Sequence, residues 1–432
     1  MISPLVRFRS RLVAHEREAL DRSRILTSAI RGFVLTITIP SSSAPLRTSQ
    51  TRLPSSLTLI SRLSCRRAGT RFNSRGIDDD GNVANFVESE TIYWAPVGQS
   101  TVDTSSTERP AGICFSYVQI RGSVPVFWEQ TAGLLPGQQK ITVTRSCEGT
   151  QPAFDKHFGE LEQNYGAVHV VNLLSETKPG EAELATLYRS GIKHSALNNS
   201  EHGTSRDQQL LRETEFDFHA ETKGPNGYEA ASLIRRLIEN SAEGFAYYLS
   251  EEIEDQTDES KPHRRTVVVL QQEGVFRTNC LDCLDRTNLI QTIISQMAIE
   301  AFLGHQGERA ASDFWMRHSS LWADNGDALS RIYAGTGALK SSFTRHGKMS
   351  LAGAIADARK SATRLYINNF ADKGRQNTID VLLGRMVGQA PVHLFDPIND
   401  YVTAELNKRY SEFQSSQVIN MYASASPSHF RC

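Results

Sequence analysis

The chain has 432 residues, enough for about two or three domain-sized units or for one large catalytic region with a satellite. Its 47 basic and 48 acidic residues leave a net charge of −1, so no positive field draws it to nucleic acid. No apolar run approaches the roughly 18–20 residues of a membrane span, and the six cysteines lack the spacing of a disulfide framework. These features favour a globular protein of a reducing compartment, such as the cytoplasm, with no transmembrane segment and no nucleic-acid partner.

Residues 1–65 form the least regular stretch of the sequence. They are rich in Ser and Arg, contain no Lys, and carry only three acidic residues, Glu16, Glu18 and Asp21. The run 41–43 is all serine and lies close to prolines, which discourages regular structure. We predict a disordered or atypical extension here. An acid-poor start rich in Arg and Ser also has the composition of a transit peptide.

Residues 66–150 show short apolar runs separated by turn residues. Asp80-Gly81 is a hairpin signal, and the polar stretch Gly98–Gly112 is expected to be an exposed linker. The sequence therefore predicts a β-rich N-terminal subdomain. Its expected strands are Asn82–Val87, Thr91–Trp94, Ser116–Ile120 and Ile141–Thr144.

Residues 151–395 alternate between helical and strand patterns, which is typical of an α/β catalytic region. A buried strand is expected at Val168–Leu174, and the charged stretch Glu251–Arg265 is expected to be an exposed loop. Residues 396–432 are left as a C-terminal tail. The predicted fold class is α/β, with the β-rich subdomain followed by the catalytic domain. Its helices are expected at Phe154–Tyr165, Ala230–Leu249 and Leu351–Phe370.

The most informative segment is Arg277–Asn288, in which Cys280 is followed by five residues and then by Arg286. This spacing lets one loop wrap a phosphate, with backbone N–H groups pointing inward and the guanidinium fork on two oxygens. Upstream, Thr266–Leu270 has the pattern of a buried strand. Downstream, apolar residues recur at helical spacing up to Gly304, so the positive end of a helix would also face the anion.

A phosphate monoester is a poor and already negative electrophile, so its nucleophile must be ionised. A free cysteine has a pKa of about 8.5, which falls to roughly 3.5–7.5 at a helix N-terminus beside a cation. Attack by Cys280 would give a phosphocysteine that water hydrolyses, while Thr287 can donate a hydroxyl to the sulfur. Asp282 and Asp285 are the nearest acids for protonating the leaving alkoxide.

Other interpretations of the same residues remain open at this point. The spacing of Cys280 and Arg286 alone is weak, because it arises by chance in long chains. Cys280 and Cys283 also form a C-x-x-C pair, which could be a redox centre or half of a zinc site. No second C-x-x-C exists in the chain, and two aspartates with an arginine are unusual in a redox motif. A purely structural loop is the third possibility.

The loop resembles that of the Sac-domain phosphoinositide phosphatases, in particular their synaptojanin-like branch. It matches the family pattern R-x-N-C-x-D-C-L-D-R-T-N at every fixed position. Further similar stretches follow in order, so that the resemblance runs from about residue 66 to about residue 395. They are Arg67–Asn73, Arg75–Glu88, Gln119–Trp128, Phe216–Ala220, Trp322–Asp327 and Tyr333–Lys340. The family would place opening strands of the N-terminal subdomain within residues 1–65, which the sequence does not let us match, so that subdomain is expected to be incomplete.

The resemblance implies a phosphoinositide substrate from which a ring monoester, the 4- or 3-phosphate, is released without a metal or other cofactor. It implies that Cys280 is the nucleophile, Arg286 the phosphate-binding residue and Asp282 the proposed acid. It also implies lipid metabolism and membrane trafficking as the setting. The further residues expected to contact substrate are Asn279, Leu281, Cys283, Leu284, Asp285, Thr287 and Lys340.

Two other segments are candidates for contact with substrate or membrane. Phe216–His219 could bring Asp217 or His219 near the loop, although a lone histidine among aromatic residues is more often a packed core residue. Lys340 opens a basic, glycine-rich segment with Arg345, in which each cation near an anionic membrane contributes about 1 kcal/mol. A solvated surface loop explains that segment equally well.

We therefore expect a peripheral membrane enzyme acting on phosphoinositides. A catalytically silent phosphoinositide-binding or adaptor module is the alternative. Synaptojanin-like relatives carry a magnesium-dependent 5-phosphatase domain after the Sac region; this chain ends at Cys432, so no 5-phosphatase activity is expected from it.

Overall fold

The computed structural model describes residues 13–14, 17–18, 32–46, 53–96, 108–131, 140–198, 210–223, 227–255, 263–279, 281–282, 284–339, 344–345, 351–367 and 372–382. The chain divides into two compact units, one made of Met1–Ile30 and Lys373–Cys432 and the other of Arg31–Asp372. The helix α12 (Asp372–Leu382) begins at the boundary and is described by itself. Everything that follows concerns the second unit.

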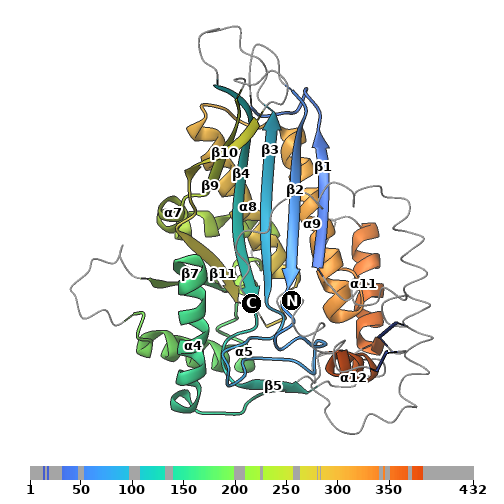
Figure 1. Cartoon of the computed structure of the whole chain (residues 1–432). Coiled ribbons are helices and arrows are strands. Elements are labelled where there is room, and N and C mark those ends of the chain that lie inside the picture. The colour runs from blue at the N-terminus through green and yellow to red at the C-terminus, as the bar shows by residue number, and fades with distance from the viewer. Residues whose placement is uncertain are drawn as a thin grey trace. The chain divides into compact units, whose positions relative to one another are not determined.

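A mixed sheet forms the centre of this unit (Figure 1). Within the described residues it has nine strands, seven of them in the order β1-β2-β3-β4-β11-β7-β8, while β9 pairs with both β4 and β10. A separate ribbon joins β5 to β6. In chain order the strands are β1 (Gly32–Ile39), β2 (Ser55–Leu63), β3 (Val87–Pro96), β4 (Glu108–Gly122), β5 (Trp128–Thr131), β6 (Lys140–Val143), β7 (Ala167–Asn172), β8 (Leu211–Glu215), β9 (Tyr248–Asp255), β10 (His263–Leu270) and β11 (Gly274–Asn279).

The strand pairing in the sheet changes from antiparallel to parallel at β4. Strands β1 to β4 pair antiparallel in sequence order, whereas β4, β11, β7 and β8 pair in parallel. The parallel strands are in register, so that Asn279 pairs with both Gly122 and Asn172, and Asn172 pairs with Glu215. Four carboxyl ends therefore lie in one row across the sheet, the place where open α/β sheets bind ligands.

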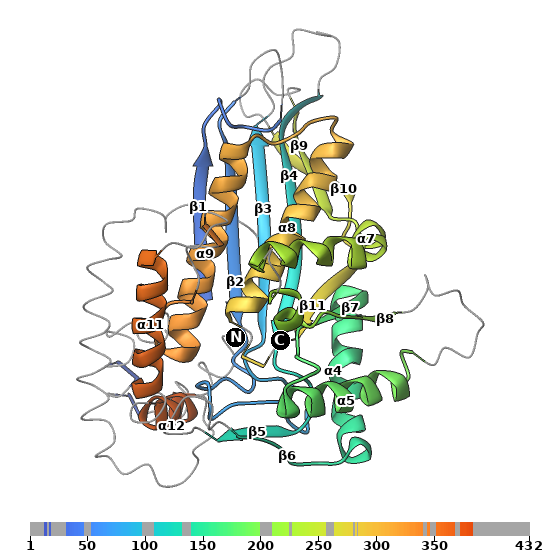
Figure 2. The same cartoon turned by 180° about the vertical axis from the view of Figure 1, so that it is seen from behind.

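Helices cover both faces of the parallel half of the sheet. Alternation along β11 shows the division: Phe276 belongs to the apolar cluster with α7, α8 and α9, and Val275 to the cluster with α4 and α5. Figure 2 shows α8 and α9 in front of the strands, and Figure 1 shows α4 on the other side. The helices are α4 (Cys147–Tyr165), α5 (Pro179–His194), α6 (Phe218–Glu221), α7 (Ile234–Phe245), α8 (Asp285–His305), α9 (Ser312–Ala334) and α11 (Leu351–Tyr366), with the 3₁₀ helix η2 (Gly227–Leu233).

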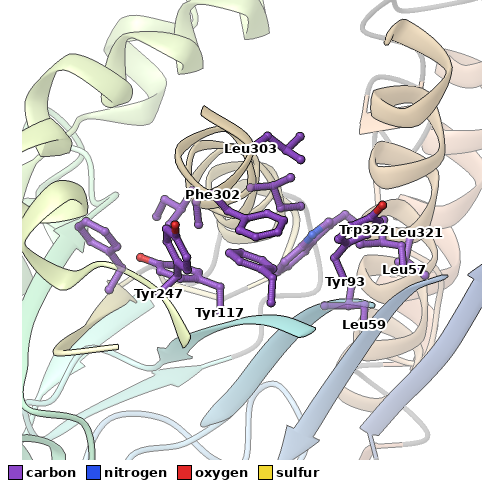
Figure 3. Packing of buried hydrophobic residues seen from close by; sticks show 14 of the residues in the cluster. Leu57, Leu59, Tyr93, Tyr117, Tyr247, Phe302, Leu303, Leu321 and Trp322 are labelled. Atoms are coloured by element: carbon purple, nitrogen blue, oxygen red, sulfur yellow. The ribbon is translucent and has the colours of Figure 1, made fainter. Parts of the chain in front are cut away.

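The larger apolar cluster packs helices α8 and α9 against β2, β3 and β4 (Figure 3). Phe302 of α8 is fully buried, and its ring centroid lies 5.0 Å from that of Phe115, 5.7 Å from Tyr247 and 6.2 Å from Tyr93. Aromatic rings at these separations add attraction to the apolar area that they bury. This packing fixes α8 on the sheet and with it the start of the helix.

The structure confirms several predicted elements. The strands expected at Thr91–Trp94 and Ser116–Ile120 are parts of β3 and β4, and that at Ile141–Thr144 is β6 with a shift of one residue. The predicted buried strand Val168–Leu174 is β7 with the two buried residues that follow it. The helices expected at Phe154–Tyr165 and Leu351–Phe370 are α4, which begins earlier, and α11, with residues 368–370 outside the described part. The helix after the loop is α8.

The strand that leads into the loop is a different one from that predicted. Thr266–Leu270 does form a strand, as part of β10, but Val268 and Val269 are 46% and 52% exposed. The buried strand is β11, every residue of which is buried. A β-branched run therefore marked an edge strand, and the shorter Gly-Val-Phe run marked the centre of the sheet.

Three further predictions are wrong in part. They concern one helix and one loop in the second half of the chain, and the linker before β4. The expected helix Ala230–Leu249 is shorter, because η2 precedes α7 and Ala246, at a φ of 50°, ends the helix before β9. The expected loop Glu251–Arg265 is largely a hairpin of β9 and β10, whose charges lie on strands, with residues 256–262 outside the described part. The expected linker Gly98–Gly112 ends in β4, which starts at Glu108.

The N-terminal part also differs from the sequence prediction. Asn82–Phe86 is not a strand, because Asn85 has a φ of 51° and only Val83 makes an isolated bridge, to Ile77; Val87 is the first residue of β3. The Asp80-Gly81 turn is present, with the Gly81 N–H donating to Asp78. Within residues 1–65, β1 and β2 extend the sheet beyond β3, so for these residues the prediction of an extension without opening strands is wrong.

We expect Phe302→Ala to lower the free energy of unfolding by about 3–5 kcal/mol, because truncation leaves a cavity among three aromatic rings. Urea denaturation followed by tryptophan fluorescence measures the change. Val34→Ala, at a side chain that is 56% exposed on β1, is the matched control and should change little. Equal losses in the two variants would contradict the packing described here.

Candidate active site

The candidate site lies at the carboxyl edge of the parallel strands. β7 runs into Leu173 and α5, β8 runs into α6, and β11 runs through residues 280–284 into α8. Cys280 and Cys283, as well as Lys340, lie outside the described residues. The residues on both sides of Cys280, Asn279 and Leu281, are described.

Arg286 is the second residue of α8, at its positive end. Its Nη1 lies 3.3 Å from Oε2 of Glu181 in the first turn of α5 and 3.4 Å from the carbonyl oxygen of Leu173. The Arg286 side chain is 20% exposed, whereas that of Glu181 is 4% exposed. The guanidinium therefore lies at the carboxyl edge, held from one side by a buried carboxylate.

Asp282 is bound by two arginines from the segment that precedes β3. Arg71 makes a two-pronged contact, with Nε 3.0 Å from Oδ1 and Nη2 2.5 Å from Oδ2. Arg75 adds a contact of 2.7 Å from Nη2 to Oδ1. Burial alone would raise the pKa of Asp282, but the two cations outweigh it and hold that pKa far below the usual range. Asp282 is therefore ionised at neutral pH.

Arg75 also holds the backbone of the loop. Its Nη1 donates to the carbonyl oxygen of Leu281 at 2.8 Å, and its Nη2 to Oε1 of Gln130. The side chain is 2% exposed and lies over the ring of Trp128, with 5.2 Å from Cζ to the centroid. A guanidinium this deeply buried needs several partners to offset its desolvation, and here they include the loop.

Asp285 is the first residue of α8, and its carboxylate is held by Leu339 and by Arg364 of α11. Its Oδ1 accepts from the Leu339 N–H at 2.7 Å, and its Oδ2 lies 3.3 Å from Nη1 of Arg364 in α11. Burial raises the pKa of Asp285 above its ordinary value, although Arg364 opposes the shift. Leu284 before it packs with Tyr333 in a small apolar cluster, so its side chain is part of the core.

Two buried polar side chains flank the loop. Asn279, the last residue of β11, and Thr287, in the first turn of α8, are both fully buried. Within the part of the chain that the structure describes, the side-chain amide of Asn279 has no hydrogen-bond partner for either its nitrogen or its oxygen. The hydroxyl of Thr287 has none there either. Buried polar groups without partners are costly in proteins, and a ligand in the loop is one way to satisfy them.

Asp217 and His219, which the sequence offered as possible catalytic residues, lie at the same edge. Asp217 caps α6, with Oδ1 accepting from the N–H groups of His219 and Ala220, while Oδ2 accepts from the Glu176 N–H at 2.9 Å. Burial and then the nearby cations Arg286 and Lys178 lower the pKa of His219 to about 4, so the ring is neutral at pH 7. Asp217 is thus a capping residue, and His219 lies close to Arg286.

The basic segment after residue 339 is described only in part. Arg345 contacts Asp324 and lies 3.9 Å from Asp327, both in α9. The positive charge of Arg345, which the sequence offered for contact with a membrane, therefore has two acidic partners within the protein.

The site contains residues that the sequence reasoning did not single out. Arg71 and Arg75 stood within stretches matched to the family, but no role could be read from them. Glu181 and Arg364 carried no motif at all, because an acid in the first turn of a helix and an arginine on a helix face are ordinary features. No cluster of metal-binding side chains occurs among the described residues, and none of the described helices is long and apolar enough to span a membrane.

Comparison with known proteins identifies the family of the chain. The profile of the SacI homology domain matches residues 1–223. Inositol-1,4,5-trisphosphate 5-phosphatase 1 of Schizosaccharomyces pombe is 47% identical over 425 residues, which are 98% of this chain and 35% of that protein. Polyphosphatidylinositol phosphatase INP53 of Saccharomyces cerevisiae is 43% identical over 429 residues, 98% of this chain and 34% of that protein.

Human synaptojanin-1 is 39% identical over 330 residues, 75% of this chain and 18% of that protein. The chain thus spans about a third or less of the length of these relatives. It belongs to the SacI homology domain family and has synaptojanin-like relatives, as its motifs predicted.

One carboxyl group at this edge titrates near neutrality. Burial and the neighbouring Glu213 raise the pKa of Glu215 to about 7, while Asn172 Nδ2 donates to it at 2.9 Å. The folded chain therefore holds a proton that the unfolded chain releases at lower pH. Its stabilising contribution is full below the unfolded pKa and is lost as the pH rises through about 7.

We expect Glu215→Gln to raise the melting temperature relative to the parent chain at pH 8.5, because the amide cannot acquire the buried charge. The two proteins should melt closer together at pH 5.5. Differential scanning calorimetry across this range measures the difference. A gap that stays constant with pH, or grows as pH falls, would contradict the raised pKa.

Proposed function

We propose that this chain is a phosphoinositide phosphatase that acts through Cys280. The observation that carries the proposal is the junction of β11 and α8, where the unpartnered polar groups of Asn279 and Thr287 stand at the end of the strand and in the first turn of the helix, next to Arg286. Names of the relatives support the substrate class, since one is called a polyphosphatidylinositol phosphatase and another an inositol-trisphosphate 5-phosphatase. The substrate is an inositol lipid at a membrane surface, with the protein bound peripherally.

In the proposed reaction the Cys280 thiolate attacks the phosphorus of a ring monoester and displaces the inositol oxygen. Arg286 and backbone N–H groups at the start of α8 stabilise the charge on the phosphoryl oxygens. Water then hydrolyses the phosphocysteine to inorganic phosphate. The cations near the loop, together with the helix end, favour the thiolate form of Cys280.

The two loop aspartates differ in their ability to supply a proton to the leaving oxygen. Asp282, which the family resemblance implied as the acid, is held by Arg71 and Arg75 and carries no proton at neutral pH. Asp285 has one arginine, Arg364, 3.3 Å from its Oδ2, and burial raises its pKa although Arg364 opposes the shift, so Asp285 is the better able of the two to hold a proton. We propose that Asp285 is the acid and that Asp282 fixes the loop.

The experiment that tests the function is phosphate release from vesicles containing each of the mono- and bis-phosphorylated phosphatidylinositols, with and without a chelator. We expect release from a 4- or 3-phosphorylated lipid that EDTA does not inhibit. Binding of these vesicles without phosphate release would favour a silent phosphoinositide-binding module. Loss of activity with the chelator would indicate different chemistry.

We expect Cys280→Ser to lower the rate of phosphate release by about a thousandfold or more, because serine is not ionised at neutral pH. Binding to phosphoinositide vesicles should stay within about threefold of the parent chain, since the loop keeps its shape. Cys147→Ser is the matched control at a free, half-buried cysteine and should retain full activity. Normal turnover in Cys280→Ser would refute the mechanism.

The roles of the two aspartates can be separated with substrates whose leaving groups differ in their need for a proton. With a phosphoinositide, whose alkoxide leaving group needs a proton, Asp285→Asn should lower kcat by about a hundredfold or more, and it should matter far less for p-nitrophenyl phosphate. Asp282→Asn should slow both substrates to a similar extent, because it disturbs the loop. The reverse pattern, with Asp282→Asn selective for the lipid, would restore Asp282 as the acid.

A further inference from the structure

The contact between Arg286 and Glu181 joins two helix N-termini at the carboxyl edge of the sheet. Glu181 is the third residue of α5, and its Oε2 lies 3.3 Å from Nη1 of Arg286. The same oxygen accepts from the Ser175 N–H at 2.9 Å, and Oε1 lies 3.7 Å from Nζ of Lys178. The carboxylate is thus held by the turn between β7 and α5 and directed at the guanidinium.

A role in helix stability alone does not account for this residue. An acid in the first turn of a helix interacts favourably with the helix dipole when it is exposed, and exposed acids occur nearby at Glu183 and Glu176. Glu181 is instead 3% exposed, where a carboxylate loses hydration that only close partners can offset. The cation that lies nearest to it is Arg286.

The chemistry of arginine allows one guanidinium to serve a carboxylate and a phosphate at the same time. The group carries five N–H donors in a fixed plane. Glu181 and the Leu173 carbonyl oxygen both contact Nη1, and the Nε–Nη2 edge of a guanidinium has the geometry that binds two phosphoryl oxygens. Holding one nitrogen in place fixes the plane, and so the direction, of that other edge.

We propose that Glu181 is a positioning residue that orients Arg286 for a phosphoryl group bound in the 280–286 loop. The inference rests on the proposed function and assigns a role to a residue outside the loop. Glu181 touches neither substrate nor nucleophile in this scheme and acts through Arg286. Lys178 lies 3.7 Å from its Oε1, and Lys178 in turn contacts Nε2 of His219.

Orientation and simple charge predict opposite effects of neutralising Glu181. If the carboxylate mattered only as a nearby negative charge, its removal would strengthen anion binding, because like charges repel. If it orients Arg286, its removal weakens anion binding although the site becomes more positive. The sign of the change in affinity therefore separates the two.

The test uses the full chain with orthovanadate and inorganic phosphate as probes, followed by isothermal titration calorimetry. We expect Glu181→Gln to weaken vanadate binding and to lower kcat/KM on the lipid by about tenfold to a hundredfold, as a misplaced binding group does. Glu181→Asp keeps the charge but withdraws the carboxylate by one methylene, and should weaken binding in the same direction. Glu183→Gln, on the exposed face of α5, is the matched control and should match the parent chain.

A double-mutant cycle shows whether Glu181 acts through Arg286. In an Arg286→Met background, Glu181→Gln should cause no further loss of vanadate affinity. Equal losses in both backgrounds, tighter vanadate binding in Glu181→Gln, or parent-like binding in folded Glu181→Gln and Glu181→Asp would each overturn the inference. If Glu181→Gln does not fold, as melting curves would show, Glu181→Asp carries the same cycle.

The outcome is separable from that of the proposed function. A parent chain that binds vanadate but hydrolyses no phosphoinositide would count against the proposed function, while the cycle still decides the role of Glu181. A parent chain that binds neither anion would overturn both.

Discussion

The ion pairs of Asp282 with Arg71 and Arg75 are the interaction on which the arrangement of this site depends. They join the loop after β11 to a segment more than 200 residues earlier in the chain. Arg75 is buried among Gln130, Trp128 and the Leu281 carbonyl oxygen, so the loop backbone and the N-terminal segment form one polar network. Removing one partner from such a network leaves an uncompensated buried charge, which is why networks of this kind hold their parts in a single geometry.

Each charged residue of the loop is paired with a different part of the unit. Asp282 is paired with the segment before β3, Asp285 with α11 and Arg286 with α5. The described charged residues of the loop are thus held by three separate parts of the unit. A loop fixed in this way changes little when an anion enters, and such preorganisation is what electrostatic catalysis requires.

The sequence predicted the parts of the molecule that local patterns determine. The helix after the loop was predictable because its apolar residues recur without interruption, and the α/β class followed from alternating patterns. The position of β11 at the centre of the sheet was not predictable, since its six residues are a weaker signal than the β-branched run of β10, which lies exposed at an edge. Arg71, Arg75 and Glu181 could not be assigned either, because pairing across 105 to 211 residues leaves no local spacing to recognise.

The order of the strands in the sheet differs from the order in which the ribosome makes them. Among the strands of the described residues, β11 is the last to leave the ribosome, yet it lies between β4 and β7, which precede it by more than 100 residues. Until it arrives, the facing edges of β4 and β7 have no neighbour and present open backbone groups, a state prone to association with other chains. The same late strand ends at the residue before Cys280. Asp282, which follows in the loop, therefore meets Arg71 and Arg75 only when the sheet closes, so a nascent or partly folded chain lacks these contacts of the candidate site.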